Sequence, residues 1–283
     1  MSSPALGLVT VGYHSEGEWA GFFDSIERST IKPEAVVVVE NSESPTSALA
    51  PLTTLPLTVL HEPGNLGYGA AANLGVRELP PQIKWVVVCN PDIRLEPETL
   101  ERLLAAQDSL PHTGLLGPGV LDIKGEIFPS ARAIPGIRIG VGHALFSKVW
   151  PRNPWTAAYL GNYTQEHPRS VGWLSGSFLL INRDVFNAIN GFDERFFMFF
   201  EDVDLGMRIK KSGYRNVYVP AARVTHSGAH STAAHEKKML LAHHKSAEIF
   251  LAKLYPHPLQ WPLRALLRLG LTLRARFQTR NLS

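Results

Sequence analysis

The sequence predicts an α/β fold in which a mostly parallel central sheet is flanked by helices and followed by a C-terminal helical appendage. Short, continuous apolar runs alternate with segments of helical spacing, which is typical of parallel strands buried on both faces. Each run stops at polar residues. The chain has 283 residues, 45% of them hydrophobic, which is enough for one large domain and an appendage. We assign residues 1–232 to the domain and 233–283 to the appendage.

The first half of the chain predicts repeated strand, helix and strand units. The runs "LGLVTVGY", "EAVVVVEN", "LTVLHEP" and "KWVVVCNPD" are expected to be strands. Helices are predicted over residues 18–28, 69–77 and 97–109, the last with Pro97 near its first turn. Because parallel strands bind ligands beyond their carboxyl ends, the four polar strand ends predict one nucleotide-sized site.

The second half is less regular. Residues 114–162 are rich in Gly and Pro and are expected to be irregular. A strand and a short helix ending before Gly191 follow, and a second helix is expected from residue 201. We predict a strand pair in "NVYVPAARVTH" and a helix over residues 233–254.

Charge and targeting signals indicate a cytoplasmic protein. The net charge is +3, but every acid lies at or before Glu248, and six basic residues follow it. The single cysteine, Cys89, fits a reducing compartment, and neither a signal peptide nor a spanning apolar stretch is recognised. We expect no nucleic-acid partner, and the sequence leaves the oligomeric state open.

The C-terminal tail has the pattern of a basic amphipathic helix. One helical stripe is apolar and arginines lie off it; the stripe consists of Leu263, Leu266, Leu267 and Leu273. Such a helix can lie in a membrane interface, attracted by anionic lipid. The alternative is a helix packed on the body of the protein with solvated arginines.

Three motifs hold candidate ligand-binding residues. Asp92 follows a buried strand, two residues after Asn90, where one carboxylate can hold a divalent cation against a diphosphate. The alternative is an Asn-Pro-Asp turn. The link "EPGNLGYGAAANLG" can bring its backbone close to an anion at a helix start, or it is a plain turn. His226, after the last strand, is a metal ligand only if it faces the same cation as Asp92.

The segment "RFFMFFEDVDLGMRIKKSG" places three acids after five bulky apolar residues. The acids can simply favour a helix start, with Asp204 and Arg208 paired four residues apart and Gly213 as the C-terminal cap. Alternatively, an apolar surround raises the pKa of one carboxylate and makes it a general base. The aromatic run would then be an apolar wall beside that carboxylate as well as part of the core.

In order, the motifs "VEN", "GNLGYGAAAN", "NPD", "GWLSGSFLLINR", "GFDERFFMFFEDVDLGMR" and "HSGAHST" resemble inverting, family-2-type glycosyltransferases of the GT-A fold. The resemblance covers residues 6–254. Within that family the chain looks most like actinobacterial rhamnosyltransferases that act on GlcNAc-diphospho-decaprenol. The segments "FPSAR", "WPRNPWT", "VGWLSGS" and "AHHKS" carry this closer similarity.

The resemblance implies roles for particular residues. Asp202 matches the catalytic base, and Glu201 is its neighbour. Asp92 and His226 match metal ligands for Mg²⁺ or Mn²⁺, although Asn90 replaces the first acid of the family's motif. Trp173 is expected to be a platform for the acceptor sugar. The nucleotide sugar is expected to contact Tyr13, Glu40, Asn65, Gly67, Asn73 and Asp92, and Glu40 stands where relatives usually have Asp.

The implied reaction moves L-rhamnose from dTDP-β-L-rhamnose to the 3-hydroxyl of GlcNAc-diphospho-polyprenol, in synthesis of a cell-wall linker. The enzyme would be held peripherally at the inner face of the cell membrane by its basic C-terminal helix. Two alternatives remain open at this stage. The same fold can transfer another sugar, such as a different deoxyhexose or galactofuranose, or the chain can be a non-catalytic, membrane-associated protein that binds sugar nucleotides.

Overall fold

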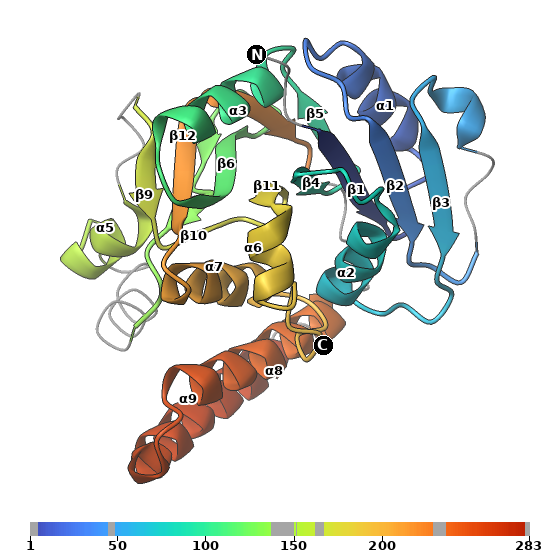
Figure 1. Cartoon of the computed structure of the whole chain (residues 1–283). Helices are drawn as coiled ribbons and strands as arrows, with labels where there is room; N and C mark the ends of the chain where they lie inside the picture. Colours follow the sequence, from blue (N-terminus) through green and yellow to red (C-terminus); the bar gives the residue numbers. More distant parts are fainter. Residues whose placement is uncertain are drawn as a thin grey trace.

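The computed structural model describes residues 5–44, 49–136, 150, 152–161, 167–228 and 236–280. A ten-stranded sheet forms its centre, with the main order β3-β2-β1-β4-β11-β6-β12-β5 (Figure 1). Four neighbouring strands are parallel: β1 (Leu6–Gly12), β2 (Ala35–Glu40), β3 (Leu57–His61) and β4 (Trp85–Cys89). These strands confirm the sequence-based expectation for the first half of the chain.

The other half of the sheet is mixed. Its strands are β5 (Ile93–Leu95), β6 (Thr113–Leu121), β7 (Ile127–Phe128), β9 (Arg169–Val171), β11 (Phe178–Asn182) and β12 (Arg215–His226). β11 runs antiparallel to both β4 and β6, and β12 is parallel to β6. A separate two-stranded sheet is made by β8 (Ala131–Arg132) and β10 (Trp173–Leu174).

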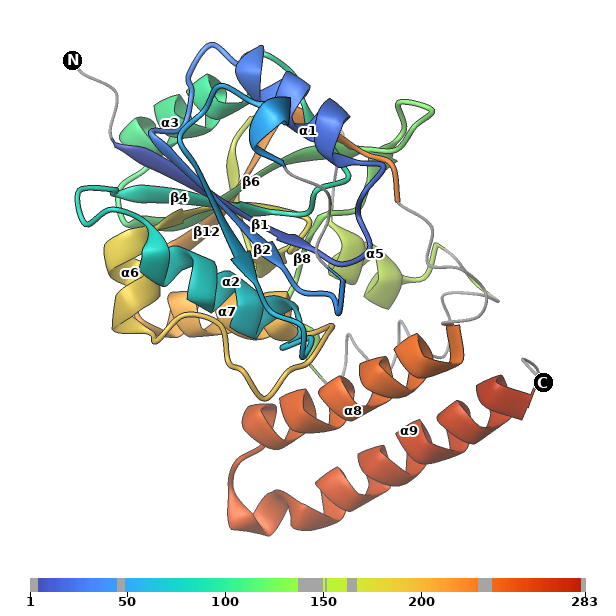
Figure 2. The same ribbon diagram turned by 90° about the vertical axis from the view of Figure 1, so that its right-hand side faces the viewer.

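Helices cover both faces of the sheet (Figures 1 and 2). α1 (Trp19–Glu27) and α3 (Thr99–Ser109) pack on one face, where Trp19, Phe22 and Phe23 are fully buried. α2 (Tyr68–Glu78), α6 (Arg183–Ala188) and α7 (Glu201–Lys211) cover the other face. A 3₁₀ turn, η1 (Ala50–Leu52), precedes β3. Two apolar layers therefore enclose the sheet, as an α/β fold requires.

The expectation of irregular structure after residue 114 was wrong for β6, which crosses the middle of the sheet. Its glycines allow close packing: a Cβ at Gly117 would lie 3.0 Å from Leu174. Pairing and packing from both sides outweigh the low strand preference of Gly and Pro. Part of the same stretch forms the helix α5 (Pro154–Leu160), which begins after a cap in which Asn153 accepts from the Thr156 N–H at 2.8 Å.

Two further boundaries differ from the prediction. The expected strand pair at residues 216–226 is one strand, β12, whose register shifts between Val219 and Arg223. It stays continuous because β6 pairs with it on both sides of the irregularity. Pro97 lies outside the first turn of α3, which begins at Thr99 after Glu98.

The C-terminal region forms α8 (Glu236–Leu254), the short turn η3 (Pro258–Gln260) and α9 (Trp261–Arg280). Figure 2 shows α8 and α9 side by side and antiparallel, with α8 next to the body. In the described part of the chain, no helix has both the length and the hydropathy to cross a membrane. The boundary expected between residues 232 and 233 lies outside the described residues.

The predicted apolar stripe of the tail is half-buried at some of its leucines and exposed to solvent at another. Leu263 and Leu267 are half-buried, whereas Leu266 is exposed, and the side chain of Leu273 is outside the described set. One arginine of the tail has an acidic partner on another helix, because Arg268 Nε lies 3.0 Å from Glu248 Oε2 on α8. The helix therefore packs on α8 rather than on the sheet domain.

Candidate active site

The carboxyl ends of the parallel strands meet at one edge of the sheet. Gly12 pairs with Glu40, and Glu40 pairs with His61, so the ends of β1, β2 and β3 are in register. β4 ends beside them, because Thr10 pairs with Cys89. This confirms the expectation that the polar strand ends lie together.

Glu40 and the glycine-rich link are joined through Asn41. Glu40 is 4% exposed and its Oε1 atom would lie 3.3 Å from a Cβ at Gly12. Asn41 Nδ2 donates to Asn65 Oδ1 at 3.0 Å, and Asn41 Oδ1 accepts from the Leu66 N–H at 2.8 Å. Asn41 therefore holds the link against the end of β2, and sequence reasoning had not singled it out.

Gly67 is required by a close contact within the protein. Its φ is 84°, and a Cβ there would lie 2.3 Å from the Phe197 carbonyl oxygen. The next residue, Tyr68, donates its N–H to the same oxygen at 3.1 Å. Only glycine combines this left-handed backbone with so close an approach.

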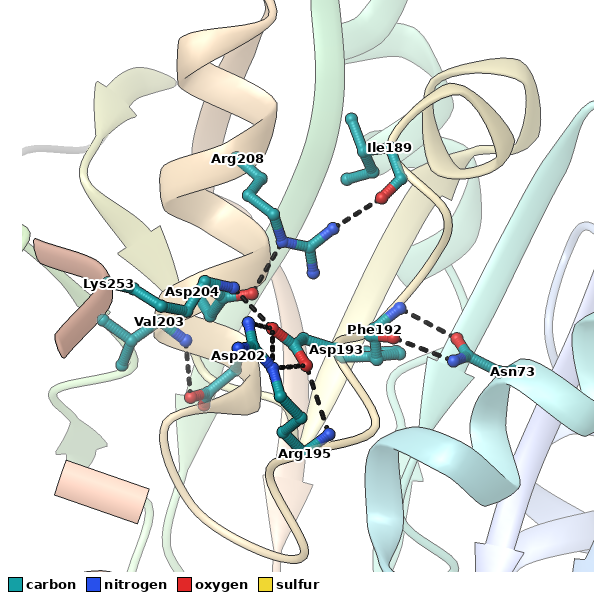
Figure 3. A network of polar contacts seen from close by, with 10 residues as sticks. All are labelled: Asn73, Ile189, Phe192, Asp193, Arg195, Asp202, Val203, Asp204, Arg208 and Lys253. Atoms are coloured by element: carbon teal, nitrogen blue, oxygen red, sulfur yellow. Dashed lines mark hydrogen bonds and ion pairs between the residues drawn. The ribbon is translucent and has the colours of Figure 1, made fainter. Parts of the chain in front are cut away.

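Tyr13 and Asn73 occupy different surroundings. Tyr13 follows β1 and is 46% exposed, so its ring is accessible at the edge of the sheet. Asn73 is buried in α2 and uses its amide internally: Nδ2 donates to the Phe192 carbonyl at 2.9 Å, and Oδ1 accepts from the Phe192 N–H at 2.8 Å. Asn73 thus joins α2 to the loop before α7 (Figure 3). Its amide has this structural role, whereas a contact with the nucleotide sugar was expected.

Asp92 and His226 lie together, as the metal hypothesis requires. His226 pairs with Ile93, so the register of β12 on β5 places the imidazole beside the preceding residue, Asp92. His226 Nε2 is 3.0 Å from Asp92 Oδ2, and Asn90 Nδ2 is 3.5 Å from the same nitrogen. Among the described residues, no cluster of three or more His, Cys, Asp or Glu side chains could hold a metal ion.

These side chains fit a divalent cation bound jointly with a ligand. A buried carboxylate oxygen and an imidazole nitrogen are both ligands that Mn²⁺ accepts. A site with so few protein ligands is typical where substrate phosphates and waters complete the coordination. The donor set therefore agrees with a single-carboxylate site.

Asp202 is held at the start of α7 by the backbone. Its Oδ2 accepts from the Gly176 N–H at 2.9 Å. Its Oδ1 accepts from the Val203 N–H at 2.8 Å (Figure 3). The Gly176 carbonyl in turn accepts from the Tyr68 hydroxyl at 2.6 Å. Tyr68 and Gly176 thereby orient the carboxylate, and sequence reasoning missed both as site residues.

Burial makes the two neighbouring acids hard to ionise. It raises the pKa of Asp202, while hydrogen bonds from Gly176 and Val203 and the charge of Arg132 lower it in part. Burial, reinforced by the charge of Asp202, raises the pKa of Glu201 to about 8. Glu201 Oε2 has no hydrogen-bond partner within the described ranges. Both acids therefore hold a proton more strongly than an exposed carboxyl group does, and the charge of one disfavours ionisation of the other.

The raised pKa of Glu201 predicts that stability falls as pH rises. The group ionises near 4.5 in the unfolded chain and near 8 in the folded protein, so between these values only the folded protein keeps the proton. The free energy of unfolding should then decrease by on the order of 3 kcal/mol from about pH 5 to pH 8. Glu201→Gln should remove most of this decrease in urea unfolding.

Glu78→Gln, on the exposed face of α2, is the control for this pH series. It should keep the wild-type pH dependence. A Glu201→Gln profile that parallels that of the wild type would show that Glu201 ionises normally.

Asp204 is part of a buried ionic network and is separate from the proposed base, Asp202 (Figure 3). Its Oδ2 lies 2.6 Å from Arg208 Nε, which confirms the predicted pair, and its Oδ1 pairs with Lys253 Nζ from α8. Lys253 also lies 2.6 Å from Asp193 Oδ2, and Asp193 pairs with Arg195. Arg195 and Lys253 together hold the pKa of Asp193 well below its usual range. The network ties α8 to the loop before α7 through Asp193 and to α7 itself through Asp204.

Lys253→Met should destabilise the protein by about 1–3 kcal/mol, because Asp204 is fully buried and would lose one of its two cations. Thermal or urea unfolding measures the change. Lys245→Met, on the exposed face of the same helix, should leave stability unchanged. Equal effects of the two substitutions would contradict the network's role.

The aromatic run at residues 196–200 packs partly on α8. Phe196 is fully buried, as its expected core role requires, Phe197 is 42% exposed, and the remaining three residues of the run are half-buried. Phe199 and Phe200 both have φ of 66°, a costly conformation for bulky residues. Ring contacts with His243, at 5.4 and 5.2 Å, hold this turn, and Ser246 Oγ donates to the Met198 carbonyl at 2.7 Å. The strained turn thus aims α7, and with it Asp202.

Trp173 is a core residue in this structure, in contrast to the expected open platform for a sugar. It is 7% exposed and packs with Phe196, Val203, Met207 and Phe250. Its Nε1 donates to the Ala133 carbonyl at 3.0 Å, and the Arg132 guanidinium lies over its ring. Both the polar end and one face of the indole are therefore already in use.

Solved structures share this architecture. The structure of GalNAc-T7 with UDP, GalNAc and Mn²⁺ matches with a TM-score of 0.58 and 16% identity, over 87% of this chain and 47% of that one. The chain thus spans about half the length of GalNAc-T7. The structure of S. aureus TarS 1–349 matches with a TM-score of 0.54 and 13% identity, over 96% of this chain and 80% of that one. The fold is that of a GT-A glycosyltransferase.

Sequence comparison then identifies the family. The family model described as "Glycosyltransferase like family 2" matches residues 6–240, and the chain belongs to this family. The N-acetylglucosaminyl-diphospho-decaprenol L-rhamnosyltransferase of Mycobacterium tuberculosis is 40% identical over 98% of this chain and 93% of its own length. Rhamnosyltransferase WbbL of Escherichia coli K12 is 39% identical over 29% of this chain and 31% of its own.

Proposed function

We propose that the protein transfers L-rhamnose from dTDP-β-L-rhamnose to the 3-hydroxyl of GlcNAc-diphospho-polyprenol with inversion at the anomeric carbon. The observation that carries the chemistry is Asp202, a half-buried carboxylate with a raised pKa, oriented by the Gly176 N–H near the ends of the parallel strands. The choice of substrates is supported by the relative that matches nearly the whole chain.

In this proposal Asp202 accepts the proton of the attacking hydroxyl group. Glu201, whose pKa is raised by burial and by the charge of Asp202, is the close neighbour of this base. The hydroxyl oxygen forms a bond to the anomeric carbon as the bond from that carbon to the diphosphate oxygen breaks. The diphosphate departs on the side opposite the attack, which gives an α linkage.

Asp92 and His226 would hold Mg²⁺ or Mn²⁺ against the leaving diphosphate, and Glu40, Tyr13 and the link at residues 62–67 would contact the rest of the nucleotide. The cation would stabilise the negative charge that develops on the departing diphosphate. The support for it is the donor set of Asp92 and His226, described above.

A substrate panel tests the proposed function. The purified protein is incubated with several nucleotide sugars and a short-chain GlcNAc diphospholipid, and products are identified by mass spectrometry. Transfer from dTDP-rhamnose alone is expected. Transfer of another sugar would reassign the donor, and no transfer from any donor would favour a binding protein without turnover.

We also propose that residues 233–283 keep the enzyme at the cytoplasmic face of the cell membrane, where a lipid-linked acceptor lies. Large apolar side chains are exposed at η3 and α9: Leu259 at 81%, Trp261 at 64%, Leu266 at 67% and Leu269 at 55%. Arg264 lies on the same helix. This combination fits an interfacial helix on anionic lipid.

Replacing Trp261, Leu266 and Leu269 together by Gln should weaken binding to anionic vesicles at least about tenfold, since each apolar side chain contributes to insertion. Vesicle co-sedimentation measures the loss. Leu52→Gln, an exposed position on η1, is the control. Wild-type binding by the triple variant would contradict the membrane role.

A further inference from the structure

Arg132 stands out as a cation in the active-site region that the proposed mechanism leaves without a task. It lies in "FPSAR", one of the segments that carry the closer resemblance. Its guanidinium carbon is 5.6 Å from the ring centre of Phe128, 5.6 Å from that of Tyr159 and 5.4 Å from that of Trp173. Its Nε donates to the Pro129 carbonyl at 2.7 Å. Three rings and one hydrogen bond therefore hold the guanidinium in place.

The charge of Arg132 is not neutralised by an ion pair. Across the described residues, no carboxylate lies within salt-bridge distance of it. The side chain is partly exposed, and the neighbouring residues Ile127 and Phe128 are 47% and 44% exposed. A fixed, accessible guanidinium without an acidic partner is suited to bind an anion from solution, and its planar fork matches phosphate oxygens.

The backbone connects Arg132 first to the base and then to the metal ligands. Arg132 pairs with Trp173, and Gly176, three residues later, donates to Asp202. The carbonyl of the next residue, Ser177, accepts from the Asn90 N–H at 3.0 Å. Residues 173–177 therefore connect the strand beside Arg132 to the base and then to the turn that holds Asp92. The backbone of these residues spans at most about 14 Å.

Inversion requires the acceptor and the leaving diphosphate to lie on opposite sides of the anomeric carbon. In the proposed mechanism Asp92 and His226 hold the leaving diphosphate, and Arg132 is joined to the other end of residues 173–177, beyond the contact with the base, so we place it with the acceptor. The charge of Arg132 lowers the pKa of Asp202, which agrees with a position near the base. We propose that Arg132 binds the diphosphate of the acceptor lipid while the acceptor hydroxyl faces Asp202. This inference rests on the proposed function, because it assumes an acceptor that carries a diphosphate.

Binding measurements without turnover test the proposal. Titration calorimetry compares three probes: a short-chain GlcNAc diphospholipid, an alkyl GlcNAc glycoside without diphosphate, and dTDP-rhamnose. Arg132→Gln should weaken binding of the diphospholipid by about 10- to 100-fold. Its affinity for the glycoside and for the donor should match that of the wild type.

Two further variants guard against a folding defect. Arg132→Lys keeps the charge without the planar fork, so its affinity for the diphospholipid should be intermediate. Arg215→Gln removes a charge at the exposed start of β12 and should bind all three probes normally. Melting temperatures establish that each variant is folded.

Wild-type affinity of Arg132→Gln for the diphospholipid would overturn the inference, as would equal losses for all three probes or no binding of the diphospholipid by the wild type. Failure of the proposed function gives a different result. If rhamnose is never transferred but diphospholipid binding depends on Arg132, the proposed donor is wrong and the assignment of Arg132 stands.

Discussion

Asp202→Asn should lower kcat by about 10²- to 10⁴-fold, the usual contribution of a positioned general base. The amide is close in size to the carboxylate but cannot accept the proton of the acceptor hydroxyl. Nucleotide-sugar affinity should be retained, because Asp202 contacts Gly176 and Val203 and lies on the acceptor side of the leaving diphosphate. Steady-state kinetics and donor titration measure the two quantities separately.

The control for this variant is Asp184→Asn, which makes the same change at an exposed position in the first turn of α6. It should be fully active. Asp202→Glu keeps the charge but displaces it by one methylene, so partial activity is expected. Near-normal turnover by Asp202→Asn would remove Asp202 as the base.

Removal of divalent cations should abolish transfer, with a loss of about 10²-fold or more in kcat, because the departing diphosphate would have no counter-charge. Activity should return when Mn²⁺ or Mg²⁺ is added to the protein after chelation. The structure offers one carboxylate at this position, so few protein groups can replace the cation. Full activity in excess chelator would refute the metal assignment.

The two ligands should respond differently to substitution. Asp92→Ala should remain inactive at any cation concentration, whereas His226→Ala should be rescued by about tenfold or more additional Mn²⁺, because a neutral ligand contributes less than a charged one. Paramagnetic resonance of Mn²⁺ with dTDP present reports binding without turnover. Similar Mn²⁺ affinity in His226→Ala and the wild type would exclude the histidine from the coordination shell.

The elements predicted best are those whose signal is local. The valine-rich runs became β2 and β4, and their polar ends met at one edge of the sheet. The pairing of Asp204 with Arg208 was also predictable, because a helix fixes the spacing of residues four apart. By contrast, β6 was missed, since a strand rich in Gly and Pro forms only when neighbours pair with it on both sides.

The candidate site shows the same division. Sequence patterns were enough to select Asp92, His226 and Asp202, but not to determine what surrounds them. The register of β12 on β5 placed His226 beside Asp92, and the β10–β11 connection placed the Gly176 N–H on Asp202. The burial of Trp173 and the internal hydrogen bonds of Asn73 changed the interpretation of both residues.

The sequence by itself determined the α/β class, the order of most elements and the residue types available for catalysis, because hydrophobic periodicity and turn chemistry act over neighbouring residues. Tertiary structure alone decided that Lys253 of α8 secures the helix carrying the base and that Arg132 sits among three aromatic rings. Most of these contacts join residues far apart in the chain. They depend on strand register and packing, which local sequence patterns do not encode.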